Sequence, residues 1–223
     1  MRIALIGYGK MGHAVEALAV ERGHTVACTI DRDDPWPEGL DADVAVEFTT
    51  PQTAADNVRR CLERGVPVVC GTTGWYARYD EVADECRRRN GRLLAATNFS
   101  LGMNIMFELN RRLAELMRGR DDYRVGISET HHIHKLDAPS GTAITLQQQI
   151  VEGGGRSVER VPITSYREGE VPGTHTVVYD SAIDTITLTH EAHSRLGLAQ
   201  GAVVAAEWLA KAGPGVYTMK DIL

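Results

Sequence analysis

The sequence predicts an α/β protein with two domains, a doubly wound parallel sheet followed by an α+β domain with a mixed or antiparallel sheet. Short apolar strands alternate with helices over the first hundred residues, which is typical of parallel sheets. Strands then predominate between positions 123 and 189. We therefore expect one domain over residues 1–100, completed by 195–223, and a second domain over residues 101–194.

The first domain is expected to alternate strands and helices along the chain. Apolar or alternating runs predict strands at 2–6, 25–30, 43–48, 66–70 and 92–97. Helical periodicity predicts helices from the first turn to about position 22, at 53–64 and at 78–89. A last helix at 201–211 has Trp208 and Leu209 on its apolar side and is expected to return to this domain.

A different order of elements predicts the second domain. Strands are expected at 123–130, 161–167, 175–179 and 183–189, with a helix at 142–151 that should stop at the three glycines 153–155. A long helix at 103–117 precedes them. Its apolar residues have helical spacing and are interpreted as core: Ile105, Met106, Leu109, Leu113 and Leu116.

A glycine-rich turn joins the first strand to the first helix. Gly7, Gly9 and Gly12 have the GxGxxG spacing of a dinucleotide site, because glycines permit the tight turn, the approach of a pyrophosphate and close packing of helix on strand. Asp31 ends the second strand, where it can bind the ribose 2′-hydroxyl and would repel a 2′-phosphate. The pattern predicts a Rossmann-type site for NADH, although Arg32 could hold the phosphate of NADPH. Residues 31–34, which read DRDD, also fit an ordinary polar loop.

Small polar loops follow the later strands of the first domain. They lie at 49–51, 71–74 and 98–100, with the sequences TTP, GTTG and NFS. Ligands bind at the carboxyl ends of parallel strands, so we expect these loops to border the nicotinamide half of the cofactor. Any one of them taken alone fits ordinary turn chemistry equally well.

The densest group of reactive side chains lies between positions 129 and 143, which read ETHHIHKLDAPSGTA. The segment joins a strand to a helix whose first residues, Ser140, Gly141 and Thr142, offer unpaired amides and a helix dipole to a carboxylate or phosphate. Lys135 adds a positive charge, and the histidines can transfer protons near neutral pH. We therefore expect a pocket for a small anionic substrate.

A metal site and a solvated polar loop are the two alternative interpretations of this segment. His132 and His134 would share a face of an extended segment and, with Asp137, could bind a metal, but the regular spacing of zinc ligands is missing. A solvated polar loop would leave the Pro-Ser-Gly-Thr turn without a purpose. We expect no metal.

Composition limits the partners and the setting. Lys and Arg total 24 against 30 Asp and Glu, a net charge of −6, and without a long basic run the chain is not expected to bind nucleic acid. The four scattered cysteines indicate reduced thiols and a cytoplasmic setting rather than a disulfide framework. No signal peptide or membrane-spanning segment is expected.

Several motifs together resemble the 4-hydroxy-tetrahydrodipicolinate reductase family, also called dihydrodipicolinate reductase, over nearly the whole chain. They are the segment at 129–143, GYGKMG at 7–12, GTTG at 71–74, NFSLGMN at 98–104 and HEAHSR at 190–195. The resemblance implies NAD(P)H-dependent reduction of a cyclic imine with two carboxylates, in lysine and diaminopimelate biosynthesis. It also implies a homotetramer joined through the second domain. Thr97 and Ile133 depart from the residues that the family more often has there.

The same resemblance implies roles for individual residues. His131 would be the acid/base residue and Lys135 the proton donor. The substrate would be held by His132, Lys135, Ser140, Gly141 and Thr142, and the cofactor by Gly7, Tyr8, Gly9, Lys10, Met11, Gly12, Asp31, Arg32, Gly71, Thr72, Thr73, Ala96, Thr97, Asn98 and Phe99. Two alternatives stay open, namely another NAD(P)-dependent oxidoreductase of amino or imino dicarboxylates, and an NAD-binding protein without catalytic activity.

Overall fold

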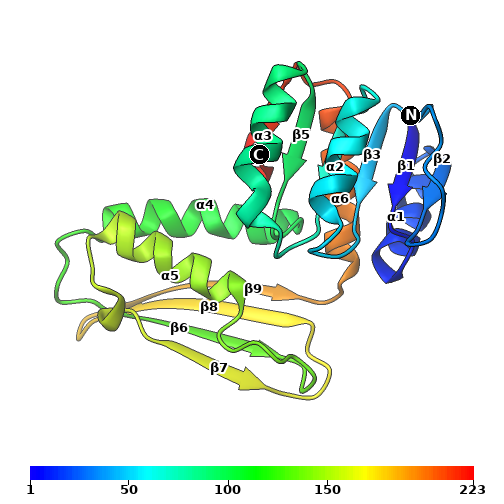
Figure 1. Ribbon diagram of the computed structural model, residues 1–223. Coiled ribbons are helices and arrows are strands. Elements are labelled where there is room, and N and C mark those ends of the chain that lie inside the picture. The colour runs from blue at the N-terminus through cyan, green and yellow to red at the C-terminus, as the bar shows by residue number, and fades with distance from the viewer. The chain divides into compact units, whose positions relative to one another are not determined.

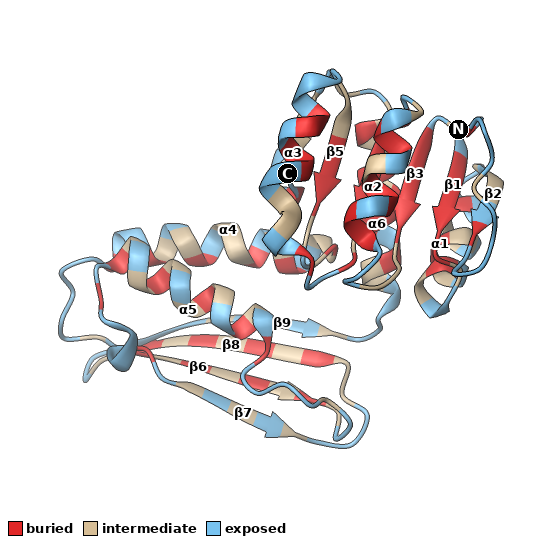
Figure 2. Cartoon of the chain, in the orientation of Figure 1, coloured by how far each residue is buried: buried red, intermediate tan, exposed pale blue.

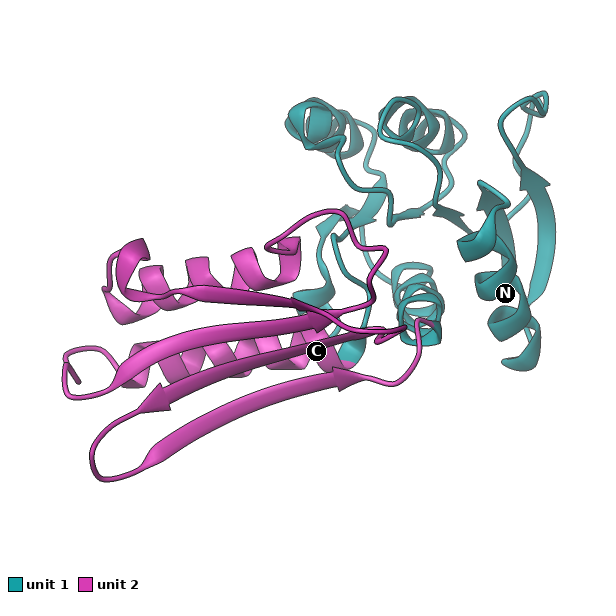
Figure 3. Ribbon diagram, turned by 90° about the horizontal axis from the view of Figure 1, so that it is seen from below, with its two compact units in different colours: residues 1–101, 196–223 teal, residues 102–195 magenta.

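The structure, a computed structural model, describes residues 1–223 and divides into two compact units (Figure 1; Figure 3). Unit 1 contains Met1–Leu101 and Leu196–Leu223, and unit 2 contains Gly102–Arg195. Each unit has its own sheet and its own buried core. The chain therefore leaves unit 1 once and returns to it for its last helix.

Unit 1 is a six-stranded parallel sheet with helices on both faces (Figure 1). The order of the strands is β10-β5-β4-β3-β1-β2, and every neighbouring pair is parallel. Helices α2 and α3 cover one face, and α1 and α6 cover the other. The elements are β1 (Arg2–Ile6), α1 (Lys10–Glu21), β2 (Thr25–Ile30), β3 (Val44–Glu47), α2 (Ala54–Glu63), β4 (Val68–Cys70), α3 (Tyr79–Arg88), β5 (Arg92–Ala95), α6 (Leu196–Leu209) and β10 (Gly215–Tyr217).

The alternation of side chains along the strands explains why both faces are covered. In β1, Ala4 and Ile6 point into the core beneath α2 and α3. Ile3 and Leu5 point into the core beneath α1 and α6. All four are fully buried or nearly so, as expected for a parallel strand between two helical layers. The predicted doubly wound sheet is confirmed.

Two features of unit 1 differ from the sequence prediction. Strand β10 was not expected, because three residues are too few to show a periodic pattern. Helix α6 begins at Leu196 rather than at position 201. Gly201 lies inside this helix, where a Cβ would come 1.7 Å from the carbonyl oxygen of Phe99. This glycine therefore permits close packing and does not start the helix.

Unit 2 is a four-stranded mixed sheet whose order is β7-β6-β8-β9. Strand β6 pairs parallel with β7 and antiparallel with β8, which pairs antiparallel with β9. Helices α4 and α5 lie on one face of this sheet (Figure 1). The elements are α4 (Leu101–Leu116), β6 (Arg124–His131), α5 (Gly141–Gly154), β7 (Ile163–Arg167), β8 (Gly173–Asp180) and β9 (Thr185–Ala192).

The helices of unit 2 correct two expectations. Ile105, Leu109 and Leu116 are about half exposed and do not belong to the core, because α4 buries a different face (Figure 2). Helix α5 extends beyond the expected position 151 through Gly153 and Gly154, and Gly155, whose φ of +64° is left-handed, caps its end. No helix of the chain combines the length and the apolar composition needed to span a bilayer.

Candidate active site

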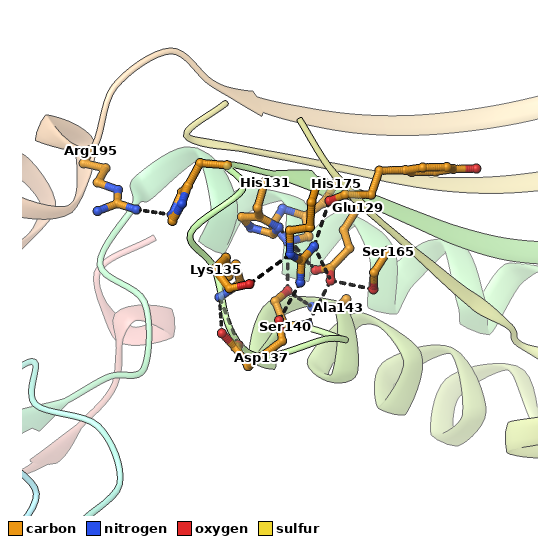
Figure 4. A network of polar contacts seen from close by, with 12 residues as sticks. Glu129, His131, Lys135, Asp137, Ser140, Ala143, Ser165, His175 and Arg195 are labelled. Atoms are coloured by element: carbon orange, nitrogen blue, oxygen red, sulfur yellow. Dashed lines mark hydrogen bonds and ion pairs between the residues drawn. The ribbon is translucent and has the colours of Figure 1, made fainter. Parts of the chain in front are cut away.

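The carboxyl end of β6 brings together residues that lie far apart in the sequence (Figure 4). Alternation along the strand places Glu129 and His131 on the same face, and both are buried. His175, on β8, lies directly opposite Glu129 in the antiparallel register and is also buried. One carboxylate and two imidazoles therefore share a buried space beside the start of α5.

Glu129 is the centre of this network. Its Oε1 atom accepts hydrogen bonds from the Ser165 hydroxyl at 2.7 Å and from the Ser140 backbone amide at 3.0 Å. The guanidinium of Arg167 lies 3.8 Å from the same oxygen. Burial alone would raise the pKa of Glu129, but the hydrogen bonds from the two serines outweigh it and hold this pKa below its ordinary value. Glu129 is therefore a carboxylate at neutral pH.

The second oxygen of Glu129 faces two imidazoles. Nδ1 of His131 and Nε2 of His175 each lie 3.6 Å from Oε2, which has no hydrogen-bond partner. The ring centroids of the two histidines are 5.0 Å apart. Burial lowers the pKa of both, that of His175 to about 4. Both rings are therefore mainly neutral at pH 7.

Helix α5 begins with donors that suit an anion. The Ser140 hydroxyl caps the helix by accepting from the Ala143 amide at 3.2 Å, and it also lies 3.2 Å from Nε2 of His175. The backbone amides of Gly141 and Thr142 donate no hydrogen bond within the chain. A Cβ added at Gly141 would meet nothing within 4 Å, so this backbone is open to a ligand.

Two of the predicted substrate-binding residues have other partners in this structure (Figure 4). Nζ of Lys135 lies 2.8 and 2.9 Å from the two carboxylate oxygens of Asp137. Nε2 of His132 lies 2.5 Å from Nη2 of Arg195. Neither Asp137 nor Arg195 was predicted to bind a ligand of the reaction. In the sequence, Asp137 is named only as a possible metal ligand and Arg195 only as the last residue of the motif at 190–195.

The only group of three side chains close enough to share a metal ion is Glu129, His131 and His175, whose candidate atoms lie within 4.8 Å of one another. This group differs from the metal ligands considered from the sequence, namely His132, His134 and Asp137. His134 pairs instead with the exposed Glu170. One oxygen of Glu129 already accepts two hydrogen bonds and lies 3.8 Å from the guanidinium of Arg167, and Nε2 of His175 faces the Ser140 hydroxyl. The arrangement suits proton transfer better than binding of a cation.

A cavity of about 310 Å³ lies at the carboxyl ends of the strands of unit 1, where a dinucleotide would bind. Gly7, Gly9, Asp31 and Arg32 line it. A Cβ at Gly7 would come 2.0 Å from the carbonyl oxygen of Phe48, whereas a Cβ at Gly9 would meet nothing within 4 Å. The first glycine therefore makes the tight turn, and the second leaves the backbone open to a ligand.

The other predicted cofactor residues do not line this cavity. Gly12 packs helix α1 on the turn, because a Cβ there would lie 2.5 Å from the carbonyl oxygen of Gly7. Tyr8 donates its hydroxyl hydrogen to Glu16, and the ring of Phe99 is buried in the core. The remainder begin α1 or follow β4 and β5: Lys10, Met11, Gly71, Thr72, Thr73, Ala96, Thr97 and Asn98. Trp36, Thr53, Asn57 and Arg60 line the cavity and were not singled out from the sequence.

Comparison with known protein families accounts for both units. A model described as dihydrodipicolinate reductase, N-terminus, matches residues 1–99, and one described as dihydrodipicolinate reductase, C-terminus, matches residues 102–223. The chain belongs to the dihydrodipicolinate reductase family. The family and the oxidoreductase class predicted from the motifs are therefore confirmed.

Individual relatives agree with this assignment. A 4-hydroxy-tetrahydrodipicolinate reductase from Christiangramia forsetii is 46% identical over 234 residues, which cover 100% of this chain and 98% of the relative. One from Thiobacillus denitrificans is 33% identical over 266 residues with the same coverage. Among solved structures, a dipicolinate-bound dihydrodipicolinate reductase from Paenisporosarcina sp. TG-14 is 22% identical and has the same fold, with a TM-score of 0.85 over 100% of this chain and 99% of that chain.

Proposed function

We propose that this member of the family reduces 4-hydroxy-tetrahydrodipicolinate with NAD(P)H, a step of lysine and diaminopimelate biosynthesis. The names of the relatives give the reaction, and each unit offers one of the two binding regions that it needs. The dinucleotide is assigned to the cavity of unit 1 and the substrate to the junction of β6 and α5 in unit 2. The observation that carries the assignment is that this junction has free amides for a carboxylate beside a buried imidazole.

The start of α5 fits one carboxylate of the substrate. The amides of Gly141 and Thr142 and the positive end of the helix dipole favour an anion there. Lys135 and His132 lie on the loop before this helix. They would contact the remainder of the substrate after leaving their present partners, Asp137 and Arg195. A relative with the same fold is described as bound to dipicolinate, a ring with two carboxylates, which makes dipicolinate a suitable probe.

Reduction of the imine needs an acid near the ring. When bound, the reduced nicotinamide supplies a hydride to the ring carbon that loss of the 4-hydroxyl leaves conjugated with the imine. Negative charge then builds toward the nitrogen and the adjacent carbon, and a positioned acid stabilises it by giving up a proton. We assign this role to the protonated form of His131, which gives up the hydrogen of one ring nitrogen and becomes the neutral ring, with Lys135 as a second donor.

Cofactor preference and assembly belong to the same proposal. Asp31 lines the dinucleotide cavity and disfavours a 2′-phosphate by charge repulsion, which supports NADH as the preferred cofactor, with Arg32 permitting NADPH. A homotetramer joined through unit 2 is supported by the sheet face of this unit that α4 and α5 leave uncovered (Figure 1). A cytoplasmic location stays an expectation from the reduced cysteines.

A coupled assay tests the reaction. Dihydrodipicolinate synthase, pyruvate and aspartate semialdehyde would generate the substrate in the cuvette, and oxidation of NADH and of NADPH would be recorded in parallel. We expect oxidation only when all components are present, and faster with NADH. Oxidation of an amino acid with NAD and no reaction with the cyclic imine would favour the other oxidoreductase class. Cofactor binding without any turnover would favour a non-catalytic protein.

A further inference from the structure

We propose that Glu129 positions His131 by holding the hydrogen of the neutral imidazole on Nδ1, so that Nε2 is the atom that exchanges a proton with the substrate. The inference rests on the proposed function for the role of His131. It adds a residue that no motif argument assigned to the reaction.

The first support is that Glu129 itself cannot turn freely. Two hydrogen bonds to Oε1, from Ser140 and Ser165, come from α5 and β7, which are different elements from the strand that bears Glu129. With one oxygen held, the position of the other is fixed. The hydrogen bond to the Ser140 amide also links the carboxylate to the helix start where we place the substrate.

The second support is the pair of unpartnered atoms that face each other. Oε2 of Glu129 and Nδ1 of His131 are both buried, both without a hydrogen bond, and 3.6 Å apart. This distance is too long for a hydrogen bond. Leaving two such groups unpaired in a buried space is unfavourable, and contacts of this kind often shorten only when the substrate binds. A hydrogen on Nδ1 would satisfy both atoms once this contact shortens.

The third support is the surroundings of the other nitrogen. Nε2 of His131 lies against Gly173, where an added Cβ would come within 3.1 Å of it. Nε2 is not among the buried atoms that lack a partner. The glycine at the start of β8 therefore leaves room beside the nitrogen that we assign to proton exchange.

The charged and titratable groups around His131 act in opposite directions. Glu129 and Asp137 favour the imidazolium, whereas Lys135 and Arg167 disfavour it together with burial. His175 packs against the ring from β8, and His190 influences His175 from β9. The groups are Glu129 on β6, Lys135 and Asp137 on the following loop, Arg167 on β7, His175 on β8 and His190 on β9. Glu129 is the carboxylate nearest to the ring, so its removal should change the protonation of His131 the most.

The wild-type protein gives the first test. Nitrogen-15 NMR of the imidazoles, with His131 assigned by comparison with His131→Gln, reports which nitrogen carries the hydrogen in the neutral ring. We expect the hydrogen on Nδ1. A neutral ring with its hydrogen on Nε2 would overturn the proposal. This readout does not use turnover, so it can fail while the reductase assay succeeds, and the reverse is also possible.

The variant Glu129→Gln gives the second test, with Glu170→Gln as its matched control. Both remove a carboxylate near a histidine, but Glu170 forms an exposed pair with His134. In Glu129→Gln we expect kcat to fall about a hundredfold with less than a threefold change in substrate KM, and the alkaline limb of the kcat profile to move to lower pH. The control should match the wild type. A fall in kcat without any shift of the profile would indicate a merely structural role and would contradict the proposal.

Folding must be checked before these results are interpreted. Circular dichroism and NADH affinity should be the same for both variants and the wild type. If Glu129→Gln does not fold, Ser165→Ala removes one anchor of the same carboxylate without changing its charge. We then expect a mixture of the two neutral tautomers of His131 in this variant. The assignment would be refuted if the wild type had no hydrogen on Nδ1 and the variant had the same tautomer as the wild type.

Discussion

Nζ of Lys135 lies 2.8 Å from one carboxylate oxygen of Asp137 and 2.9 Å from the other, so the ammonium group that we assign to substrate binding is already paired. Arg167 donates to the backbone carbonyl oxygens of both residues, which holds the loop in this form. A substrate carboxylate must therefore compete with Asp137 for the ammonium group. This competition weakens ground-state binding and holds the ammonium group of Lys135 in place before the substrate arrives.

The competition can be measured with Asp137→Asn. We expect the substrate KM to fall roughly two- to fivefold, because the ion pair that must be broken is partly exposed and worth little. The affinity for dipicolinate, measured by calorimetry, should rise by a similar factor. An unchanged KM would mean that the substrate does not use Lys135.

Removal of the proposed acid should separate chemistry from cofactor binding. In His131→Ala we expect kcat to fall by about 10² to 10⁴, the usual contribution of general acid catalysis. The Kd for NADH, measured by fluorescence, should change little, because all residues that line the dinucleotide cavity belong to unit 1. Lost NADH affinity with normal turnover is the result that would refute this assignment.

How far the sequence predicts this site can be seen from Glu129 and its neighbours. Glu129 and His131 are two residues apart in a strand, so the sequence already places them on one face. His175 could not be predicted, because it reaches Glu129 only through the register between β6 and β8. No local signal specifies that pairing, and the pairing of Lys135 with Asp137 depends on side-chain conformation.

In the fold, likewise, features set by neighbouring residues were predictable, and features set by contacts between distant elements were not. The turn at Gly7 and Gly9 was predictable, since the steric demands of a strand-turn-helix connection are local. The face of α4 that becomes buried was not predictable from the sequence. Apolar residues on more than one side of this helix give no indication of which side the sheet will cover, and Leu109 was therefore assigned wrongly to the core.

Stability should depend on pH through His175. Its pKa of about 4 in the folded protein lies below the ordinary 6.5, because burial disfavours the charged ring. Between pH 6.5 and about 4, His175 therefore binds a proton in the unfolded chain but stays neutral in the folded protein. The contribution to stability is complete above pH 6.5 and is lost as pH falls toward 4, on the order of 3 kcal/mol over the whole interval.

Urea unfolding at neutral pH and near pH 4 checks this expectation. The midpoint of the wild type should fall more steeply with acidification than that of His175→Gln, which cannot take up the proton. Titratable groups far from His175 contribute equally to both proteins and cancel in the comparison. Parallel losses in the two proteins would assign the effect to groups other than His175.

The cofactor preference should respond to the two residues at the end of β2. Asp31→Ser removes the charge that repels a 2′-phosphate, so the ratio of kcat/KM for NADPH to that for NADH should rise roughly tenfold, or about 1.4 kcal/mol. Arg32→Ala should lower the same ratio. A ratio that neither substitution changes would mean that the ribose binds elsewhere in the cavity.

The space beside His131 can be tested with Gly173→Ala. The added methyl group would lie 3.1 Å from Nε2 of His131 and would crowd the nitrogen that we assign to proton exchange. Gly173 also has a φ of +155°, which a residue with a side chain adopts only with strain. Gly169→Ala is the matched control, since this glycine in the loop between β7 and β8 has a φ of +44° but open space around it.

The two substitutions separate crowding from backbone strain. Both should lower the melting temperature, because both impose an unfavourable φ. Only Gly173→Ala should lower kcat, and it should also change the NMR shift of Nε2 of His131, because only its methyl group meets the imidazole. Equal losses of kcat in both variants would show that strain in the β7–β8 connection, and not access to Nε2, limits the reaction.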